Sequence, residues 1–297
     1  MSYAHLLPPH YRSMVVGWLK EDIPSFDYAG YVVGDKTEKA VLLCKSRGVL
    51  CGRPFVDAIF DHLGCAIDWH YEEGTELTPI CEVAHMTGPI RALLQGERTA
   101  LNCLTRSSGI ATHARELDKI AKNANWPGSV AGTRKTTPGF RLVEKYALLV
   151  GSIATHRYDL SSMVMLKDNH IWCMGSISKA VKRAREVASF SSKIEVECRS
   201  VEEAREAITS GADVVMLDNF EPKTLQQSSA LLKSEFPHVI IEASGGIRTE
   251  NIEQYFCPTV DVISLSTTTQ GYSTVDFSFK LLKEGRDPTN PTVSTVQ

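Results

Sequence analysis

Two adjacent cations among small polar residues form the most chemically suggestive stretch of the chain. Residues 132–141 are Gly-Thr-Arg-Lys-Thr-Thr-Pro-Gly-Phe-Arg. Arg134 offers a planar fork of donors and Lys135 a compact point charge, so the pair suits an anionic ligand. The window from Arg134 to Lys167 holds six Lys or Arg and two acids, although the chain carries a net charge of −3. A local positive field favours a small polyanion over a nucleic acid, which would need a broad basic face.

Further polar residues follow apolar, strand-like runs. They are Lys167, Glu197, Asp218, Ser244-Gly245-Gly246 and Ser266. In a βα barrel the carboxyl ends of the strands form one rim, so we expect these side chains to converge on one pocket. Glu197 and Asp218 are suited to Mg²⁺ or to ribose hydroxyls. The Ser-Gly-Gly turn and the Ser/Thr-rich loop around Ser266 are suited to a phosphate held by backbone amides.

The elements that would position these residues recur at regular intervals after residue 125. Apolar runs begin about 20 to 25 residues apart and alternate with helical patterns such as Val201–Ser210 and Lys223–Glu235, the length of one βα unit. At least six such units predict a parallel sheet with right-handed crossovers. No Gly-x-Gly-x-x-Gly turn follows the first strand, which favours a barrel over an open doubly wound sheet. The predicted strands are Ser129–Gly132, Ser162–Leu166, Lys193–Cys198, Val214–Leu217, Val239–Ala243 and Val260–Leu265.

The first part of the chain has a different pattern of predicted strands and helices. Short strand patterns at Ala40–Lys45, Ala66–Tyr71 and Pro79–Met86 alternate with helical patterns at Tyr11–Lys20 and Pro54–Leu63. A longer helical pattern starts near Ile90, is interrupted at Ser107-Ser108-Gly109 and resumes to about Asn123. These features predict an α+β domain over residues 1–112 and a βα barrel over 113–269, with 270–297 packing back on the first domain.

Composition limits the function classes. The chain of 297 residues is 43% hydrophobic and 23% charged, and no apolar run approaches the length of a membrane span. Its eight cysteines include no Cys-x-x-Cys pair, and several lie in apolar runs, as expected of reduced thiols. The N-terminus lacks the pattern of a secretory signal. We therefore expect a cytoplasmic protein, with the nucleus as an alternative, that binds neither membrane nor nucleic acid.

Several of these residues also have ordinary explanations. Glu197 and Asp218 could be charges that stabilise helix N-termini, and Ser-Gly-Gly could be a simple strand-to-helix turn. Glu195 should point the same way as Glu197, deeper in the barrel, and would need a buried partner such as Lys193 or Lys167. His170 is as readily structural as catalytic. The residues alone indicate a barrel enzyme for a phosphorylated, multiply anionic substrate, and they do not name the reaction.

Six short motifs in the second part of the chain stand out together. They are Gly-Thr-Arg-Lys-Thr-Thr-Pro-Gly at 132–139, His-Arg-Tyr-Asp-Leu at 156–160, Lys-Asp-Asn-His at 167–170, Glu-Val-Glu-Cys at 195–198, Leu-Asp-Asn-Phe at 217–220 and Glu-Ala-Ser-Gly-Gly-Ile at 242–247. With Gly-Glu-Arg-Thr-Ala-Leu-Asn at 96–102, these motifs resemble those of the quinolinate phosphoribosyltransferase family, and the resemblance covers about residues 15–282. Residues 159–172 have the character of fungal members. The resemblance implies an N-terminal α/β sandwich and an incomplete barrel of fewer than eight strands.

It also implies a role for each matching residue. Arg134, His156 and Arg157 would surround the two quinolinate carboxylates, and Thr133 would also bind substrate. Lys135 and Lys167 would face the carboxylates and the pyrophosphate of 5-phosphoribosyl 1-pyrophosphate, and Glu197 and Asp218 would bind ribose hydroxyls and Mg²⁺, directly or through water or substrate. The catalytic set would be Lys135, Lys167, Glu197 and Asp218. Ser244, Gly245, Gly246 and Ser266 would hold the 5′-phosphate, where Ser266 replaces a glycine found in many members.

The implied reaction yields nicotinate mononucleotide, CO₂ and pyrophosphate in NAD biosynthesis, with Mg²⁺ and no organic cofactor. Arg98 would reach the site of a neighbouring subunit, which implies a homodimer with shared sites or a trimer of dimers. Three alternatives stay open. They are a phosphoribosyltransferase acting on nicotinate, a Schiff-base aldolase using Lys167 or Lys193, and a metabolite-binding protein without turnover.

Overall fold

The computed structural model describes residues 3–289 and separates them into two compact units. The first unit comprises residues up to 115, residues 138–151 and the chain from 272 onward; the second comprises 116–137 and 152–271. Residues 138–151 contain α5 (Arg141–Val150), and the boundaries proposed from the sequence do not include this excursion of the chain. Residues 290–297 of the proposed C-terminal segment lie outside the described residues.

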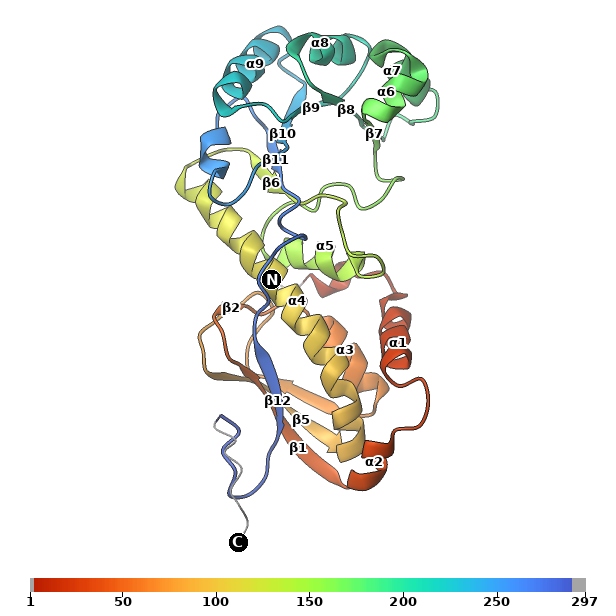
Figure 1. Cartoon of the computed structure of the whole chain (residues 1–297), viewed down its shortest axis with the longest axis vertical. Coiled ribbons are helices and arrows are strands. Elements are labelled where there is room, and N and C mark those ends of the chain that lie inside the picture. The colour runs from red at the N-terminus through yellow and green to blue at the C-terminus, as the bar shows by residue number, and fades with distance from the viewer. Residues whose placement is uncertain (1–2, 290–297) are drawn as a thin grey trace. The chain divides into compact units, whose positions relative to one another are not determined.

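An antiparallel sheet in the order β12-β1-β5-β3 forms the centre of the first unit (Figure 1). β1 pairs with β12, so a strand from the C-terminal part of the chain forms one edge of this sheet. Helix α1 packs on α3, where the rings of Tyr11 and Phe55 meet edge to face at 5.9 Å. The elements are η1 (Ala4–Leu6), α1 (Tyr11–Asp22), α2 (Tyr28–Val33), β1 (Thr37–Cys44), β2 (Gly48–Val49), α3 (Arg53–His62), β3 (Ala66–Trp69), β4 (Glu76–Leu77), β5 (Cys81–Pro89) and β12 (Phe277–Leu281).

A distant carboxylate caps the N-terminus of α3. The residue before the helix is Gly52, which has no side chain to accept the free N–H groups of the first turn. Glu73 accepts instead from the backbone N–H of Gly52 at 2.7 Å and of Arg53 at 3.1 Å. Glu73 is buried, and this burial raises the pKa of its carboxyl, although the two N–H donors oppose the shift.

Helix α4 (Ile90–Asn123) runs without a break through Ser107-Ser108-Gly109, so the predicted interruption is wrong. The hydroxyl of Ser108 accepts the N–H of Cys51 at 3.0 Å. A Cβ on Gly109 would lie 2.4 Å from the carbonyl oxygen of Ser273. These small residues therefore allow close approach of neighbouring backbone, and they do not end the helix.

The second unit is built on a parallel sheet of six strands in the order β7-β8-β9-β10-β11-β6 (Figure 1). Strands β7 to β11 lie side by side in the order in which they occur in the chain. β6, which precedes them in the sequence, lies at the opposite edge beside β11. Among the described residues the edge strands β6 and β7 do not pair with each other, and residue Ala154 forms an isolated parallel bridge to Ala131 on the free side of β6. The strands are β6 (Ser129–Ala131), β7 (Val164–Leu166), β8 (Ile194–Cys198), β9 (Val214–Asp218), β10 (Ile240–Ser244) and β11 (Val262–Ser264).

Helices connect these strands in the manner of βα units, and their starts are locally encoded. Ser176 and Ser200 accept N–H groups at the N-termini of α7 and α8, and Pro222 begins α9. The helices are α6 (Asp168–Met174), α7 (Ile177–Arg185), α8 (Val201–Thr209), α9 (Pro222–Glu235) and the short η2 (Ile252–Tyr255). The six predicted strands and the incomplete barrel of fewer than eight strands are confirmed.

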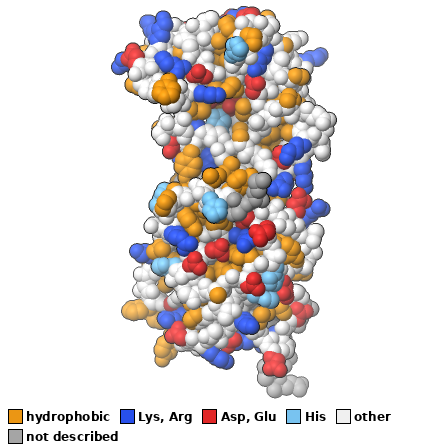
Figure 2. Space-filling model, turned by 180° about the vertical axis from the view of Figure 1, so that it is seen from behind, with side chains coloured by type: hydrophobic (Ala, Val, Ile, Leu, Met, Phe, Trp, Pro, Cys, Tyr) orange, Lys and Arg blue, Asp and Glu red, His pale blue; other side chains and the backbone are white. Residues whose placement is uncertain are grey.

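The surface carries mixed charges. On the face shown in Figure 2, Lys and Arg side chains are interspersed with Asp and Glu, and orange side chains protrude around the end that holds α2. Large apolar side chains in or just before α2 are exposed, among them Phe26, Tyr28, Tyr31 and Val32. Within residues 3–289, no helix combines the length and apolar character that crossing a membrane requires.

Candidate active site

One cavity of about 590 Å³ lies at the carboxyl ends of the parallel strands in the second unit. It is lined by residues that follow or end all six strands, as the barrel geometry predicts. The structure brings together these predicted residues: Thr133, Arg134, Lys135, His156, Arg157, Lys167, Glu197, Asp218, Ser244, Gly245, Gly246 and Ser266. Arg98 is not among them; it is exposed on α4, in the first unit.

Cationic side chains form part of the lining of this cavity. Arg134 and Lys135 follow β6, and their loop is fixed by Thr269, whose hydroxyl donates to the carbonyl oxygen of Lys135 at 2.7 Å. The hydroxyl of Thr133 accepts the N–H of Lys135 at 3.1 Å. Burial lowers the pKa of Arg157, and the nearby guanidinium of Arg134 lowers it further. Two guanidinium groups that repel each other are stabilised by an anion placed between them.

The imidazole of His156 is held at both nitrogens. Its Nδ1 accepts the backbone N–H of Arg157 at 2.7 Å, so the ring proton lies on Nε2, which donates to Glu242 at 3.0 Å. His156 itself has a left-handed backbone with φ 59°, uncommon outside glycine. The ring therefore ties the Arg157 backbone to the floor of the cavity.

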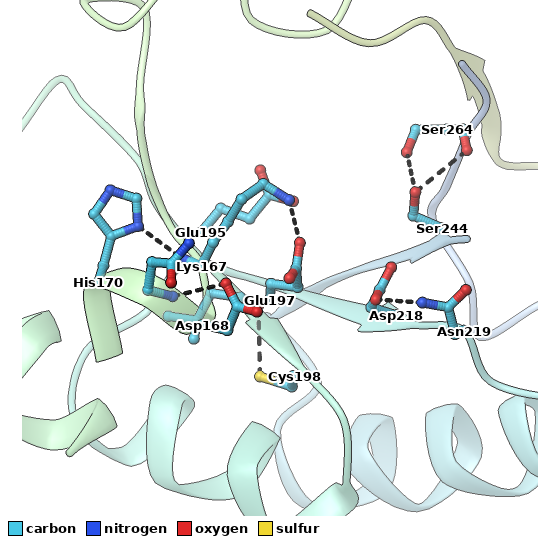
Figure 3. A network of polar contacts seen from close by, with 12 residues as sticks. Lys167, Asp168, His170, Glu195, Glu197, Cys198, Asp218, Asn219, Ser244 and Ser264 are labelled. Atoms are coloured by element: carbon cyan, nitrogen blue, oxygen red, sulfur yellow. Dashed lines mark hydrogen bonds and ion pairs between the residues drawn. The ribbon is translucent and has the colours of Figure 1, made fainter. Parts of the chain in front are cut away.

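Glu242 is a cavity residue that sequence reasoning did not single out. It lies on β10, is 3% exposed, and accepts the hydroxyl of Ser264 at 2.6 Å in addition to His156. The hydroxyl of Ser264 also lies 3.1 Å from that of Ser244 (Figure 3). A usable signal was present, because Glu242 is two residues before Ser244 in a strand and so points to the same face.

Glu195 lies beneath this network without a hydrogen bond. It is completely buried on β8, and neither carboxylate oxygen has a hydrogen-bond partner among residues 3–289, although Oε2 lies 3.9 Å from Nε2 of His156. Burial raises the pKa of its carboxyl, and the nearby Glu242 raises it further. The predicted ion pair with Lys167 or Lys193 is wrong, because Lys167 pairs with Glu197 and Lys193 is exposed.

His156, Glu195 and Glu242 offer ligand atoms that all lie within 4.8 Å of one another, close enough to suggest a metal site. The hydrogen bonds argue against it. A metal would bind the lone pair of Nε2, yet that nitrogen carries the proton because Nδ1 is an acceptor. We therefore interpret this trio as a buried polar network.

Glu197 and Asp218 form a second acidic pair at the ends of the adjacent strands β8 and β9. Figure 3 shows the ion pair between Lys167 and Glu197 and the Asp218 carboxylate beyond it. Burial raises the pKa of Asp218, and repulsion from the Glu197 carboxylate adds to the shift. Two mutually repelling carboxylates in a cavity are the hard oxygen donors that suit Mg²⁺.

The turn after β10 has the backbone of an anion site. Gly245 and Gly246 both have positive φ, at 91° and 67°. A Cβ on Gly245 would collide with Asn219, so only glycine fits there. Ser266, which follows β11, is partly exposed and lines the same end of the cavity. His170 lies outside the cavity lining, where its Nδ1 accepts the N–H of Lys167 at 3.0 Å.

Comparison with known proteins identifies the family. Residues 26–108 match the model of the quinolinate phosphoribosyl transferase N-terminal domain, and residues 110–280 match that of its C-terminal domain. The chain is 52% identical over 279 residues to the human nicotinate-nucleotide pyrophosphorylase [carboxylating], covering 94% of each chain. It is 49% identical to the protein of that name from Dictyostelium discoideum, covering 96% of this chain and all of the other.

A solved structure agrees. The nicotinate-nucleotide pyrophosphorylase from Francisella tularensis matches with a TM-score of 0.86 at 30% identity, over 95% of this chain and 100% of that one. The fungal character expected for residues 159–172 stays a prediction. The two domain models together span most of the sequence, and the likeness extends through both units. The chain belongs to the quinolinate phosphoribosyl transferase family.

Proposed function

We propose that this chain transfers the phosphoribosyl group of 5-phosphoribosyl 1-pyrophosphate to quinolinate and decarboxylates the adduct. The products are nicotinate mononucleotide, CO₂ and pyrophosphate, as in the de novo synthesis of NAD. One observation supports this most directly. A single cavity is lined by the cations Arg134, Lys135 and Arg157, by the carboxylates of Glu197 and Asp218, and by the glycine-rich turn Ser244–Gly246. That arrangement suits a dicarboxylate beside a phosphorylated sugar.

The cations bind the two carboxylates of quinolinate. Arg134 and Arg157 offer paired donors, and the mutual repulsion of the two guanidinium groups favours a dianion between them. Thr133 lines the same wall, and His156 acts there by holding the Arg157 backbone through its own ring. Lys135 lies between this wall and the pyrophosphate.

The phosphorylated sugar lies across the opposite wall. Ser244, Gly245, Gly246 and Ser266 hold the 5′-phosphate through backbone N–H groups and hydroxyls. Glu197 and Asp218 accept hydrogen bonds from the ribose hydroxyls. In this chain Ser266 offers a hydroxyl donor where a glycine would offer only its backbone.

In the transfer step the ring nitrogen of quinolinate forms a bond to the anomeric carbon as the bond to pyrophosphate breaks. Positive charge develops on the sugar, and the carboxylates of Glu197 and Asp218 stabilise it. Lys135 and Lys167 stabilise the leaving pyrophosphate, and Lys167 is already oriented by Glu197. Glu197 and Asp218 would hold Mg²⁺, directly or through water or substrate, and the ion supplies further neutralisation of the pyrophosphate.

Decarboxylation then follows without an organic cofactor. The new bond makes the ring nitrogen positively charged, and this charge stabilises the carbanion left when the adjacent carboxylate departs as CO₂. The cavity residues contribute by orienting the adduct and limiting access of water. A proton then replaces the carboxylate at that ring carbon.

The active assembly is a homodimer or a trimer of dimers with shared sites. Arg98 supports this proposal, because it is exposed on α4 and absent from the lining of its own chain's cavity. We place the enzyme in the cytoplasm, with the nucleus as an alternative. Neither a nucleic acid nor a membrane is a partner in this proposal.

One assay tests the function. The purified protein is incubated with quinolinate, 5-phosphoribosyl 1-pyrophosphate and Mg²⁺, and pyridine-nucleotide formation is followed together with release of CO₂. Equal molar amounts of both products support the proposal. Turnover of nicotinate but not quinolinate would instead favour the monocarboxylate alternative, and trapping of a lysine adduct by borohydride would favour a Schiff-base aldolase. Ligand binding with no product would indicate a metabolite-binding protein.

A further inference from the structure

Asn219 contacts both Asp218 of the acidic pair and Gly245 of the phosphate turn. It directly follows Asp218 at the end of β9 and lines the cavity. Its backbone is left-handed, with φ 58°. Among residues with side chains, Asn and Asp adopt this conformation most readily. Position 219 therefore requires a residue that tolerates a left-handed backbone, and the residue present also places a polar side chain in the cavity.

The side chain of Asn219 forms a hydrogen bond with Asp218. Its Nδ2 donates to Oδ2 of Asp218 at 2.5 Å, and Figure 3 shows the amide beside the carboxylate. The amide thus fixes the direction of the carboxylate.

The backbone of Asn219 forms a hydrogen bond with the end of the neighbouring strand β10. Its N–H donates to the carbonyl oxygen of Ser244 at 2.9 Å, continuing the register in which Ser244 pairs with Asp218. Gly245 packs directly against it. A Cβ on that glycine would lie 2.4 Å from Oδ1 of Asn219 and 2.8 Å from its backbone nitrogen. The phosphate turn is therefore built on the surface that Asn219 provides.

We infer that Asn219 is a positioning residue that joins the Asp218 carboxylate and the Ser244–Gly246 turn into one rigid unit. This inference rests on the proposed function, in which the first group binds ribose and Mg²⁺ and the second binds the 5′-phosphate. Both groups contact the same sugar phosphate, so their separation must match its length. Asn219 acts on 5-phosphoribosyl 1-pyrophosphate through these neighbours and leaves the quinolinate wall untouched.

The variant Asn219→Gly tests the inference, because glycine keeps the left-handed backbone while it removes the side chain with its amide. Asn125→Gly is the matched control. Asn125 is also exposed and left-handed, with φ 53°, and it lies after α4 outside the cavity lining. Thermal unfolding of both variants should match that of the wild type within a few degrees.

The expected result is a selective loss. Removing a residue that orients a metal-binding or substrate-binding group typically costs about 10–100-fold in affinity or activity. For Asn219→Gly we expect kcat/KM for 5-phosphoribosyl 1-pyrophosphate to fall by about that factor, and half-maximal activity to need more Mg²⁺. Calorimetric affinity for quinolinate alone should stay unchanged, and Asn125→Gly should behave as wild type.

A second variant distinguishes a local effect on the site from a general folding defect. Asn219→Asp also tolerates the left-handed backbone, but it places a second carboxylate against Asp218. It should lose more activity than Asn219→Gly at low Mg²⁺ and recover part of it at high Mg²⁺. The inference is overturned if both variants keep wild-type dependence on phosphoribosyl pyrophosphate and Mg²⁺, or if quinolinate affinity falls equally. A wild-type protein without turnover would instead overturn the proposed function itself.

Discussion

The Nε2 atom of His156 lies 3.0 Å from Oε2 of Glu242, and the opposite ring nitrogen accepts the N–H of Arg157. Both ring nitrogens therefore have partners inside the protein. A ring held in this way contributes orientation to the site, while the arginines and lysines contribute the positive charge. The relationship makes His156 and Glu242 a test of how the quinolinate wall is assembled.

Substitution of His156 should separate its two hydrogen bonds. Asparagine tolerates the left-handed backbone and offers an oxygen near the place of Nδ1, whereas alanine offers neither. We expect His156→Ala to raise KM for quinolinate by about 10-fold or more, and His156→Asn to recover part of that loss. Steady-state kinetics at saturating phosphoribosyl pyrophosphate measure this. Equal impairment of the two variants would show that the contact to Arg157 is unimportant.

Removal of Arg134 should weaken quinolinate binding. The loss of a charge-assisted, paired contact is expected to cost about 2–4 kcal/mol. Titration calorimetry with quinolinate measures the change. Arg183→Ala is the control, since Arg183 is exposed on α7 and pairs only with Glu186 among the ion pairs of the described residues. An unchanged affinity for Arg134→Ala would remove this residue from the binding site.

Asp218→Asn should lower turnover and alter the response to Mg²⁺. The substitution keeps the size of the side chain and removes a charge that faces the developing positive sugar. The expected signature is a fall in kcat together with a shifted Mg²⁺ titration, measured by nucleotide formation. Normal kinetics with a normal Mg²⁺ titration would exclude Asp218 from both roles.

Arg98→Ala should inactivate the protein and yet be rescued in mixed assemblies. If Arg98 serves the neighbouring subunit, a dimer of one Arg98→Ala chain and one Asp218→Asn chain retains one intact site. Mixing the two inactive variants after dissociation should therefore restore part of the activity. Failure of rescue, with mixed dimers verified by mass, would confine Arg98 to its own chain.

Glu73 should make stability depend on pH in a defined direction. Because burial raises the pKa of this carboxyl in the folded state, the folded protein binds more protons than the unfolded chain above the ordinary value of 4.5. Its contribution to the free energy of unfolding is thus greatest at low pH and falls as the pH rises through the raised pKa. The stability advantage of the wild type over Glu73→Gln should shrink between pH 4.5 and 7.5 in urea unfolding. An advantage that grows with pH would contradict the assignment.

Much of the fold follows from local pattern. Apolar runs spaced by helical segments were enough to predict six parallel strands, and the polar residues at their ends predicted one cavity. The interruption of α4 was predicted wrongly at Ser107-Ser108-Gly109. Small residues of this kind occur both where a helix ends and where a continuous helix packs closely against neighbouring backbone. What distinguishes them is contact with Cys51, which is 56 residues or more away in the sequence.

The buried network was harder to predict for the same reason. Glu242 lies in an apolar strand, and its partner His156 is 86 residues away. The partner of Glu195 was predicted wrongly because two carboxylates compete for Lys167, and only the three-dimensional arrangement shows that Glu197 has it. Spacing along the chain identifies which side chains share a rim. It does not determine which of them pair.

The order of the parallel sheet has a consequence for folding during synthesis. β6 leaves the ribosome before the other five strands, yet its partner β11 is the last of them, with Ser129 aligned to Val262. Strands β8 to β11 can each pair with the strand made just before, while β6 must wait about 130 residues for its neighbour. Its unpaired edge is therefore the surface of this unit most exposed to aggregation while the chain is still emerging.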